Sequence, residues 1–188
     1  MHLLRLPRRG RTLLVGPDSI REVVFGLEDG VVQNLTLIAG MVGGGLSSQV
    51  IVFAGAINAI AGVLSMSMGT YLSSKAERDV ALAVGDATIA PDEAEPKKDA
   101  LVMAAAYAAG ALVPIVPFAF GFFGRAVAMG AAVVLALLTL FFLGYGKAVV
   151  SHQQRIRSGL EMLVLASAAG LIGFLLGAVA RGVFGLDV

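Results

Sequence analysis

Long apolar stretches and short polar segments alternate along the chain. Five stretches are each roughly 20 residues long, which is the length of helix that crosses about 30 Å of hydrocarbon. They lie at about residues 23–45, 50–72, 100–121, 126–146 and 159–180. The pattern predicts an all-α integral membrane protein with five transmembrane helices. These form one membrane domain over residues 19–188, after a basic segment at 1–18 and with an acidic loop at 73–99.

The composition agrees with a membrane protein and excludes several other classes. Hydrophobic residues make up 57% of the 188 residues, charged residues 14%, and the mean hydropathy is +0.87. A chain this apolar is not disordered, and without cysteine it has no disulfide scaffold. The net charge of +1 gives no general attraction to nucleic acid, so the lipid bilayer is the first partner expected. No nucleotide-binding loop, zinc-protease motif or catalytic triad is visible, which favours a secondary transporter over an enzyme.

The basic residues indicate the orientation in the membrane. If the N-terminus is cytoplasmic, 12 of the 14 Lys and Arg residues fall in cytoplasmic segments, and only Arg125 and Arg181 fall outside. This predicts a cytoplasmic N-terminus, a C-terminus outside and a cytoplasmic loop 73–99. Residues 1–18 are then a basic segment on the inner leaflet or a frayed basic tail. With no targeting segment recognised, a prokaryotic plasma membrane is favoured, and a vacuolar membrane is the alternative.

The first apolar stretch contains the most unusual polar residues. Glu28 and Asp29 are adjacent acids within it, and a carboxylate in hydrocarbon usually lines a pathway or polar cavity. Asp29, Gln33, Thr36 and Gly40 follow one another at helical spacing and share a face. The alternative interpretation is that both acids lie just inside the cytoplasmic interface and remain solvated.

The second stretch combines small residues with candidate ligands. One glycine per heptad favours close helix packing, at Gly55, Gly62 and Gly69. Asn58 lies near the middle of the stretch, and Met66 and Met68 follow it. Methionine usually packs as a flexible hydrophobic side chain, but its thioether is also a soft ligand for a transition metal.

The remaining stretches carry structural signals. Pro114 and Pro117 each remove a helix hydrogen bond and predict a bend in the third stretch. The stretch at 126–146 is almost purely apolar and is expected to face lipid. Gly173 and Gly177 form a GxxxG pair that favours helix packing in the fifth.

Two helix ends can also be predicted. Ser19 and Glu22 have the spacing of a capping box, which indicates a helix start there. Glu161 lies at the cytoplasmic end of the fifth stretch, and it is expected to pair with Arg155 or Arg157.

Four segments resemble the vacuolar iron transporter (VIT/CCC1-like) family, and they occur in the order that the family shows. They are REVVFGLEDGVV at 21–32, LSMSMGTYLSSKAERD at 64–79, GALVPIVP at 110–117 and RSGLEM at 157–162. The resemblance implies a five-helix protomer and a homodimer with its pathway at the two-fold interface. It also implies proton-coupled export of Fe²⁺ or Mn²⁺ from the cytoplasm. Within it, Asp29 matches a membrane-embedded aspartate, Met66 a second-helix methionine, and Asn58 a position facing the path.

The chemistry of these residues is consistent with that function. A carboxylate and a thioether suit Fe²⁺, Mn²⁺ or Co²⁺ better than Mg²⁺ or Ca²⁺, and no permanently bound cofactor is expected. In a symmetric dimer, two Asp29 carboxylates brought close would repel and could share a proton until metal displaced it. The alternative is a non-transporting membrane module that binds metal, such as a sensor or an assembly anchor.

The chain departs from the family pattern in three ways. Thr70 replaces a common glutamate, and Glu28 replaces an asparagine, so the charge could have moved to the first helix. Loop 73–99 contains acids but no methionine, and Pro91 and Pro96 interrupt it, so the cytoplasmic metal-binding domain is predicted to be absent. A cytoplasmic mouth is expected at Thr70, Glu77, Asp79 and Glu161. The other interpretation of the loop is a solvated acidic segment.

Overall fold

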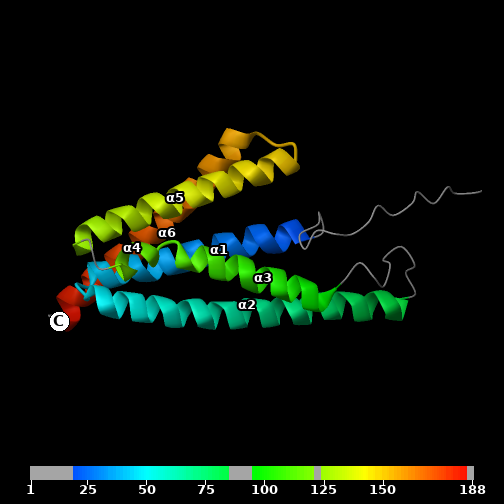
Figure 1. Cartoon of the computed structure of the whole chain (residues 1–188), viewed down its shortest axis with the longest axis horizontal. Coiled ribbons are helices and arrows are strands. Elements are labelled where there is room, and N and C mark those ends of the chain that lie inside the picture. The colour runs from blue at the N-terminus through cyan, green and yellow to red at the C-terminus, as the bar shows by residue number, and fades with distance from the viewer. Residues whose placement is uncertain (1–18, 85–94, 121–123, 186–188) are drawn as a thin grey trace, which may run out of the picture.

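The computed structural model describes residues 19–84, 95–120 and 124–185, and every regular element in that part of the chain is an α-helix (Figure 1). The helices are α1 (Ile20–Gly43), α2 (Ser48–Val84), α3 (Pro96–Leu112), α4 (Val116–Ala119), α5 (Arg125–Val150) and α6 (Arg155–Phe184). The predicted all-α class is therefore confirmed. The basic segment 1–18 lies outside the described residues.

Three of the described helices are long and apolar enough to cross a membrane, and the protein is an integral membrane protein. They are α2, α5 and α6. The 24-residue α1 contains several charged residues, and α3 ends after 17 residues. Membrane crossing by α1 and by α3 with α4 therefore stays a prediction. The start of α1 and the end of α6 lie at opposite ends of the bundle, as an odd number of crossings requires (Figure 1).

The helix α2 is longer than the second apolar stretch. Its 37 residues extend about 55 Å at 1.5 Å per residue, well beyond the hydrocarbon thickness. Residues 73–84, expected as the start of the loop, continue the helix past the beginning of α3 (Figure 1). The reason is local, because this polar segment contains Ala, Lys, Glu, Arg and Leu but neither Gly nor Pro. The loop is correspondingly shorter, and its middle, residues 85–94, is outside the described part.

The prolines open the third stretch as predicted. α3 ends at Leu112, and α4 follows after three residues. Across the break the hydrogen bonds span three residues, with Val113 N–H donating to Gly110 O and Ile115 N–H to Leu112 O, both at 3.1 Å. The carbonyl of Ala111 therefore has no helical N–H donor across the break, and a side chain from another helix bonds to it, as described below.

The central helix of the bundle is α1, since it contacts α2, α3, α5 and α6 and contributes to both hydrophobic clusters. One cluster joins it to α2, α3, α4 and α5, and the other joins it to α5 and α6. The second cluster consists of Val31, Leu35, Ala136, Leu140, Met162 and Ala166. Burial among apolar helices removes most of α1 from lipid contact, so the adjacent acids Glu28 and Asp29 lie on the helix that the others surround.

The helix α5 does not simply face lipid, which corrects the expectation for residues 126–146. Buried residues recur every fourth position on one face, and all but Leu140 are small: Ala128, Ala132, Ala136, Gly144 and Ala148. The other side exposes large side chains such as Val127 and Phe142. Hydropathy along the sequence does not reveal this asymmetry, because both faces are hydrophobic and differ only in the size of their side chains.

The helix start at residue 20 was predicted correctly, but the capping box does not form. Ser19 has φ −101° and ψ 5°, outside the extended region of a capping residue, and its side chain makes no capping bond. Its hydroxyl and one carboxylate oxygen of Glu22 are buried without a hydrogen-bond partner among the described residues.

Candidate functional site

A chain of hydrogen bonds links α1 and α3 at Asp29. The Tyr107 hydroxyl donates to the Gln33 side-chain oxygen at 2.7 Å, and the Gln33 amide nitrogen donates to Asp29 Oδ2 at 3.2 Å. The two helices approach closely because Gly30 and Gly110 face each other's helix backbones. The sequence placed Asp29 and Gln33 on one helix face, and their hydrogen bond is consistent with that placement.

A second polar cluster surrounds Asn34, which is completely buried. The Asn34 amide nitrogen donates to the Ala111 carbonyl at 2.9 Å and to the Gly55 carbonyl at 3.4 Å. The Asn58 amide nitrogen donates to the Asn34 side-chain oxygen at 2.8 Å. Asn58 is therefore held in a bond between α1 and α2, and the cluster satisfies the carbonyl that the α3 break leaves free.

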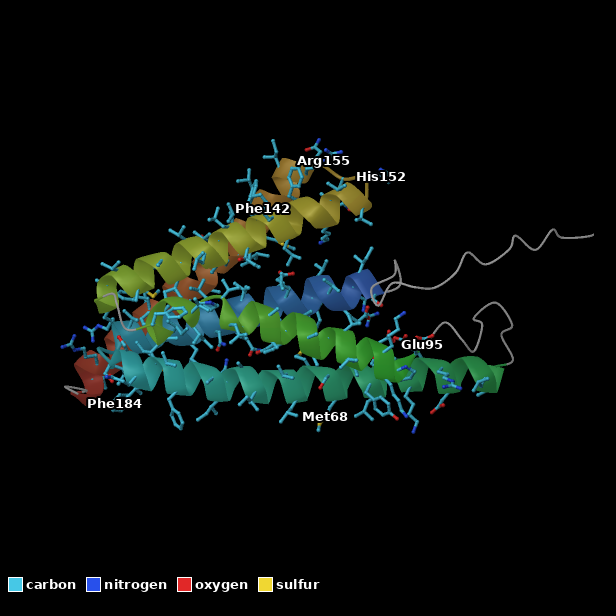
Figure 2. All side chains as sticks on the ribbon, viewed as in Figure 1. Met68, Glu95, Phe142, His152, Arg155 and Phe184 are labelled. Atoms are coloured by element: carbon cyan, nitrogen blue, oxygen red, sulfur yellow. The ribbon has the colours of Figure 1, made fainter. Side chains whose placement is uncertain are left out.

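These contacts fix the depth of α1 against α2. Asn34 bonds to Asn58, and Gln33 and Gly62 both contact the Tyr107 hydroxyl. The two helices are antiparallel, so one turn further toward the predicted cytoplasmic end brings Asp29 and Met66 to about the same depth. Met66 is half-buried and packs on the cluster that contains Tyr107. Met68 instead is 61% exposed and lies on the outer side of α2 (Figure 2).

The predicted polar face of α1 divides along its length. Thr36 donates its hydroxyl to the Val32 carbonyl at 2.7 Å, and its backbone packs against Gly173 of α6. Gly40 packs against Gly177 on the same helix. The outer half of the face is therefore covered by α6. On the other half, Asp29 is half-buried and Gln33 is exposed.

The predicted glycine strip of α2 is only partly used in packing. A Cβ at Gly55 would lie 3.2 Å from the Ile115 side chain, and one at Gly62 would overlap the Tyr107 hydroxyl. Gly69 has open space around it. The strip thus provides close packing at two of its three positions. Its central glycine admits the tyrosine ring.

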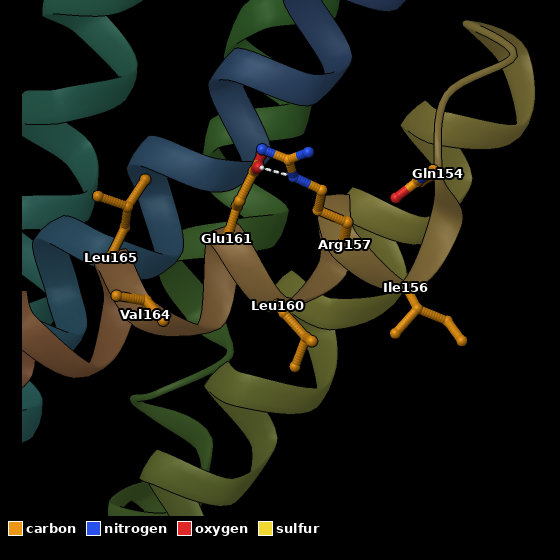
Figure 3. Close-up of a pocket in the computed structure, with 7 residues that line it drawn as sticks. All are labelled: Gln154, Ile156, Arg157, Leu160, Glu161, Val164 and Leu165. Carbon is orange, nitrogen blue, oxygen red and sulfur yellow. Dashed lines mark hydrogen bonds and ion pairs between the residues drawn. The ribbon is translucent and has the colours of Figure 1, made fainter.

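The residues expected at the cytoplasmic mouth differ in exposure, and their common role stays a prediction. Thr70 is half-buried, as is the predicted pathway residue Glu28, whereas Glu77 and Asp79 are exposed on the extension of α2. Glu161 pairs with Arg157 at 3.2 Å, as expected, beside a shallow pocket at the start of α6 (Figure 3). The pocket is lined by Gln154, Ile156, Arg157, Leu160, Glu161, Val164 and Leu165. Within the described residues, no three His, Cys, Asp or Glu side chains are close enough to hold a metal ion together.

Comparison with known proteins identifies the family. The model of the VIT family matches residues 20–88 and 81–178, which together cover most of the chain. The chain belongs to the VIT family. Vacuolar iron transporter 1 of Eucalyptus grandis is 25% identical to this VIT protein over 84% of each chain. The Arabidopsis thaliana protein of the same name is 25% identical over 87% of each. The vacuolar iron transporter of Toxoplasma gondii is 26% identical over 91% of this chain and 77% of its own.

Two polar residues of this VIT protein were not among the predicted site residues. Tyr107 lies in a run of alanines in the third apolar stretch, and Asn34 directly follows Gln33. Tyr107 could have been found as the one hydroxyl-bearing side chain in a segment of small residues. A buried tyrosine usually finds a hydrogen-bond partner, so such a residue indicates a polar contact with another helix. The signal for Asn34 was the pair of nearby prolines, which leave helix carbonyls in need of a donor.

Proposed function

We propose that this VIT-family protein exports Fe²⁺ from the cytoplasm in exchange for protons, with Mn²⁺ as a second substrate. The observation that carries the proposal is the Asp29 carboxylate, held by Gln33 on the central helix at the depth of Met66. An oxygen and a thioether ligand together suit a borderline divalent ion. The relatives named as iron transporters support iron as the first choice. Such export serves equally across a plasma membrane or into a vacuole.

We further propose that the transporting unit is a homodimer. One chain offers one carboxylate and one thioether at this depth, which is fewer ligands than a divalent ion normally binds. A two-fold axis beside α1 and α2 would double both ligands. The outer side of α2 supports this arrangement, because it exposes an apolar stripe of Phe53, Ile57, Ile60, Leu64, Met68 and Leu72. This stripe would face lipid or the second copy.

Proton exchange follows from the same symmetry. Two carboxylates close to one axis in a medium of low dielectric constant repel each other, so the metal-free dimer would hold a proton between them. A divalent cation neutralises both charges and releases that proton. Metal and proton thus compete for one site, which is the physical basis of exchange.

The test is metal uptake by proteoliposomes that contain the purified protein, with an acidic lumen and Fe²⁺ or Mn²⁺ added outside. The wild type is expected to take up Fe²⁺ faster when the pH gradient is imposed. Asp29→Asn removes the charge with little change in shape, and it is expected to reduce uptake to the level of empty vesicles. The control Asp99→Asn makes the same change in the first turn of α3 and is expected to retain uptake.

Retained pH-dependent uptake in Asp29→Asn contradicts the proposal. Metal binding without uptake by the wild type would favour a sensor or assembly anchor.

A further inference from the structure

Tyr107 is the largest fully buried side chain of the bundle, and its exposed fraction is 0%. Its ring belongs to the cluster that joins α1, α2 and α3 with α4 and α5. Its hydroxyl lies against Gly62 of α2 and donates to Gln33 of α1 at 2.7 Å. One side chain therefore connects the three helices at the level just beyond Asp29.

Gln33 stands between Tyr107 and Asp29 and bonds to both through its amide. The hydroxyl donates to the amide oxygen, and the amide nitrogen donates to the carboxylate at 3.2 Å. An ionised carboxylate only accepts hydrogen bonds, so it requires the amide nitrogen on its side. The tyrosine hydroxyl then holds the amide oxygen, which keeps Gln33 in the position from which it stabilises the carboxylate.

The glycine opposite is a condition for this contact. Tyr107 has no room to withdraw because it is fully buried, and a Cβ at residue 62 would overlap its hydroxyl. Gly62 therefore lets the tyrosine reach Gln33. The arrangement involves one residue from α2, one from α3 and two from α1.

We propose that Tyr107 is a positioning residue for metal binding, which acts on Asp29 through the Gln33 amide. This inference rests on the proposed function, in which Asp29 binds the transported cation. Tyr107 itself need not contact the ion. Its role is to keep the Asp29 carboxylate in one orientation, so its loss should weaken metal binding more than it slows movement of bound metal.

The decisive substitution is Tyr107→Phe, which removes the hydroxyl and keeps the ring. One hydrogen bond of ordinary strength corresponds to a factor of about 2 to 10 in affinity. We expect the Fe²⁺ concentration at half-maximal uptake, and the dissociation constant of the solubilised protein, to rise by about that factor. The maximal rate should change less than the half-saturation constant. Tyr145→Phe, which removes the hydroxyl of an α5 tyrosine whose ring lies under the Arg155 guanidinium, is the matched control and should match the wild type.

A double-variant cycle separates positioning from general packing. Gln33→Ala removes the intermediary, so Tyr107→Phe should have no further effect on the half-saturation constant in that background. An unchanged constant in Tyr107→Phe, or fully additive effects of the two changes, overturns the inference while the proposed function stands. A wild type that neither binds nor transports Fe²⁺ overturns the proposed function and this inference with it.

Discussion

Asn34 joins three helices through one side chain. Its amide bonds to carbonyls of α2 and α3, and its oxygen accepts the bond from Asn58. The Ala111 carbonyl needs this donor because the prolines of the third stretch replace the ordinary helical pattern there. In the apolar interior an unpaired carbonyl would be costly, so a buried amide is well suited to this position.

Asn34→Ala is therefore expected to destabilise the fold. It leaves the Ala111 carbonyl and the Asn58 amide without their partner, and an unpaired group costs about 1–3 kcal/mol when buried. Thermal unfolding in detergent should show a clear decrease in midpoint. Asn58→Ala is the comparison, because it removes one bond and leaves Asn34 bound to both carbonyls. Equal midpoints for the two variants would contradict this role of Asn34.

The polar partners of the site show where sequence reasoning stops at the residue scale. Asp29 and Gln33 are four positions apart, so helical spacing was enough to place them together. Tyr107 is 74 positions from Gln33, and Ala111 is 77 from Asn34. Such pairs depend on how deeply one helix is set against another, which hydrophobic spacing does not determine. The same limitation hid the bond between Asn58 and Asn34, while a place of Asn58 on the path stays a prediction.

At the scale of elements, the contact between α1 and α6 depends on missing side chains. A Cβ on Gly177 would overlap the Gly40 carbonyl, and one on Gly173 would overlap the Thr36 carbonyl. These are backbone atoms, so the helices would have to separate. The GxxxG spacing predicted packing correctly, although the sequence did not show which helix would be the partner.

Gly177→Ala is expected to destabilise the bundle by about 1–3 kcal/mol, as overpacking usually does. Gly182→Ala on the same helix is the matched control, since nothing lies within 4 Å of a Cβ there. In a helix the control should be neutral or stabilising by up to about 1 kcal/mol. Both are measured as thermal midpoints in the same detergent. If Gly177→Ala is as stable as its control, the close crossing is not required.

Helix lengths were predictable only where the membrane imposes them. An apolar stretch must be about 20 residues long to cross hydrocarbon, and this located α2, α5 and α6. Beyond the membrane a helix needs only residues with good helix propensity, so α2 continues to Val84 with no apolar signal. The bend at Pro114 was predictable because proline has no backbone N–H and therefore interrupts helix hydrogen bonding whatever surrounds it.

At the scale of the whole molecule, the acids of α1 lie inside the bundle and apolar helix faces lie outside it. The helix with Glu28 and Asp29 contributes to both apolar clusters, whereas the apolar spans of α2 and α6 have most of their surface exposed. Lipid, or a second copy at α2, would cover those outer faces. The orientation relative to the two sides of the membrane stays a prediction that rests on the basic residues.

The chain has no cysteine, which allows this orientation to be tested directly. Ser151→Cys places a thiol in the exposed turn between α5 and α6, and Gly182→Cys places one near the exposed end of α6. With a cytoplasmic N-terminus and five crossings, a membrane-impermeant maleimide added to intact cells should label residue 182 and not residue 151. Inverted vesicles should give the opposite result.

Labelling of both thiols from one side would exclude α6 as a membrane crossing. Labelling reversed in both preparations would place the N-terminus outside and contradict the orientation that the basic residues predict.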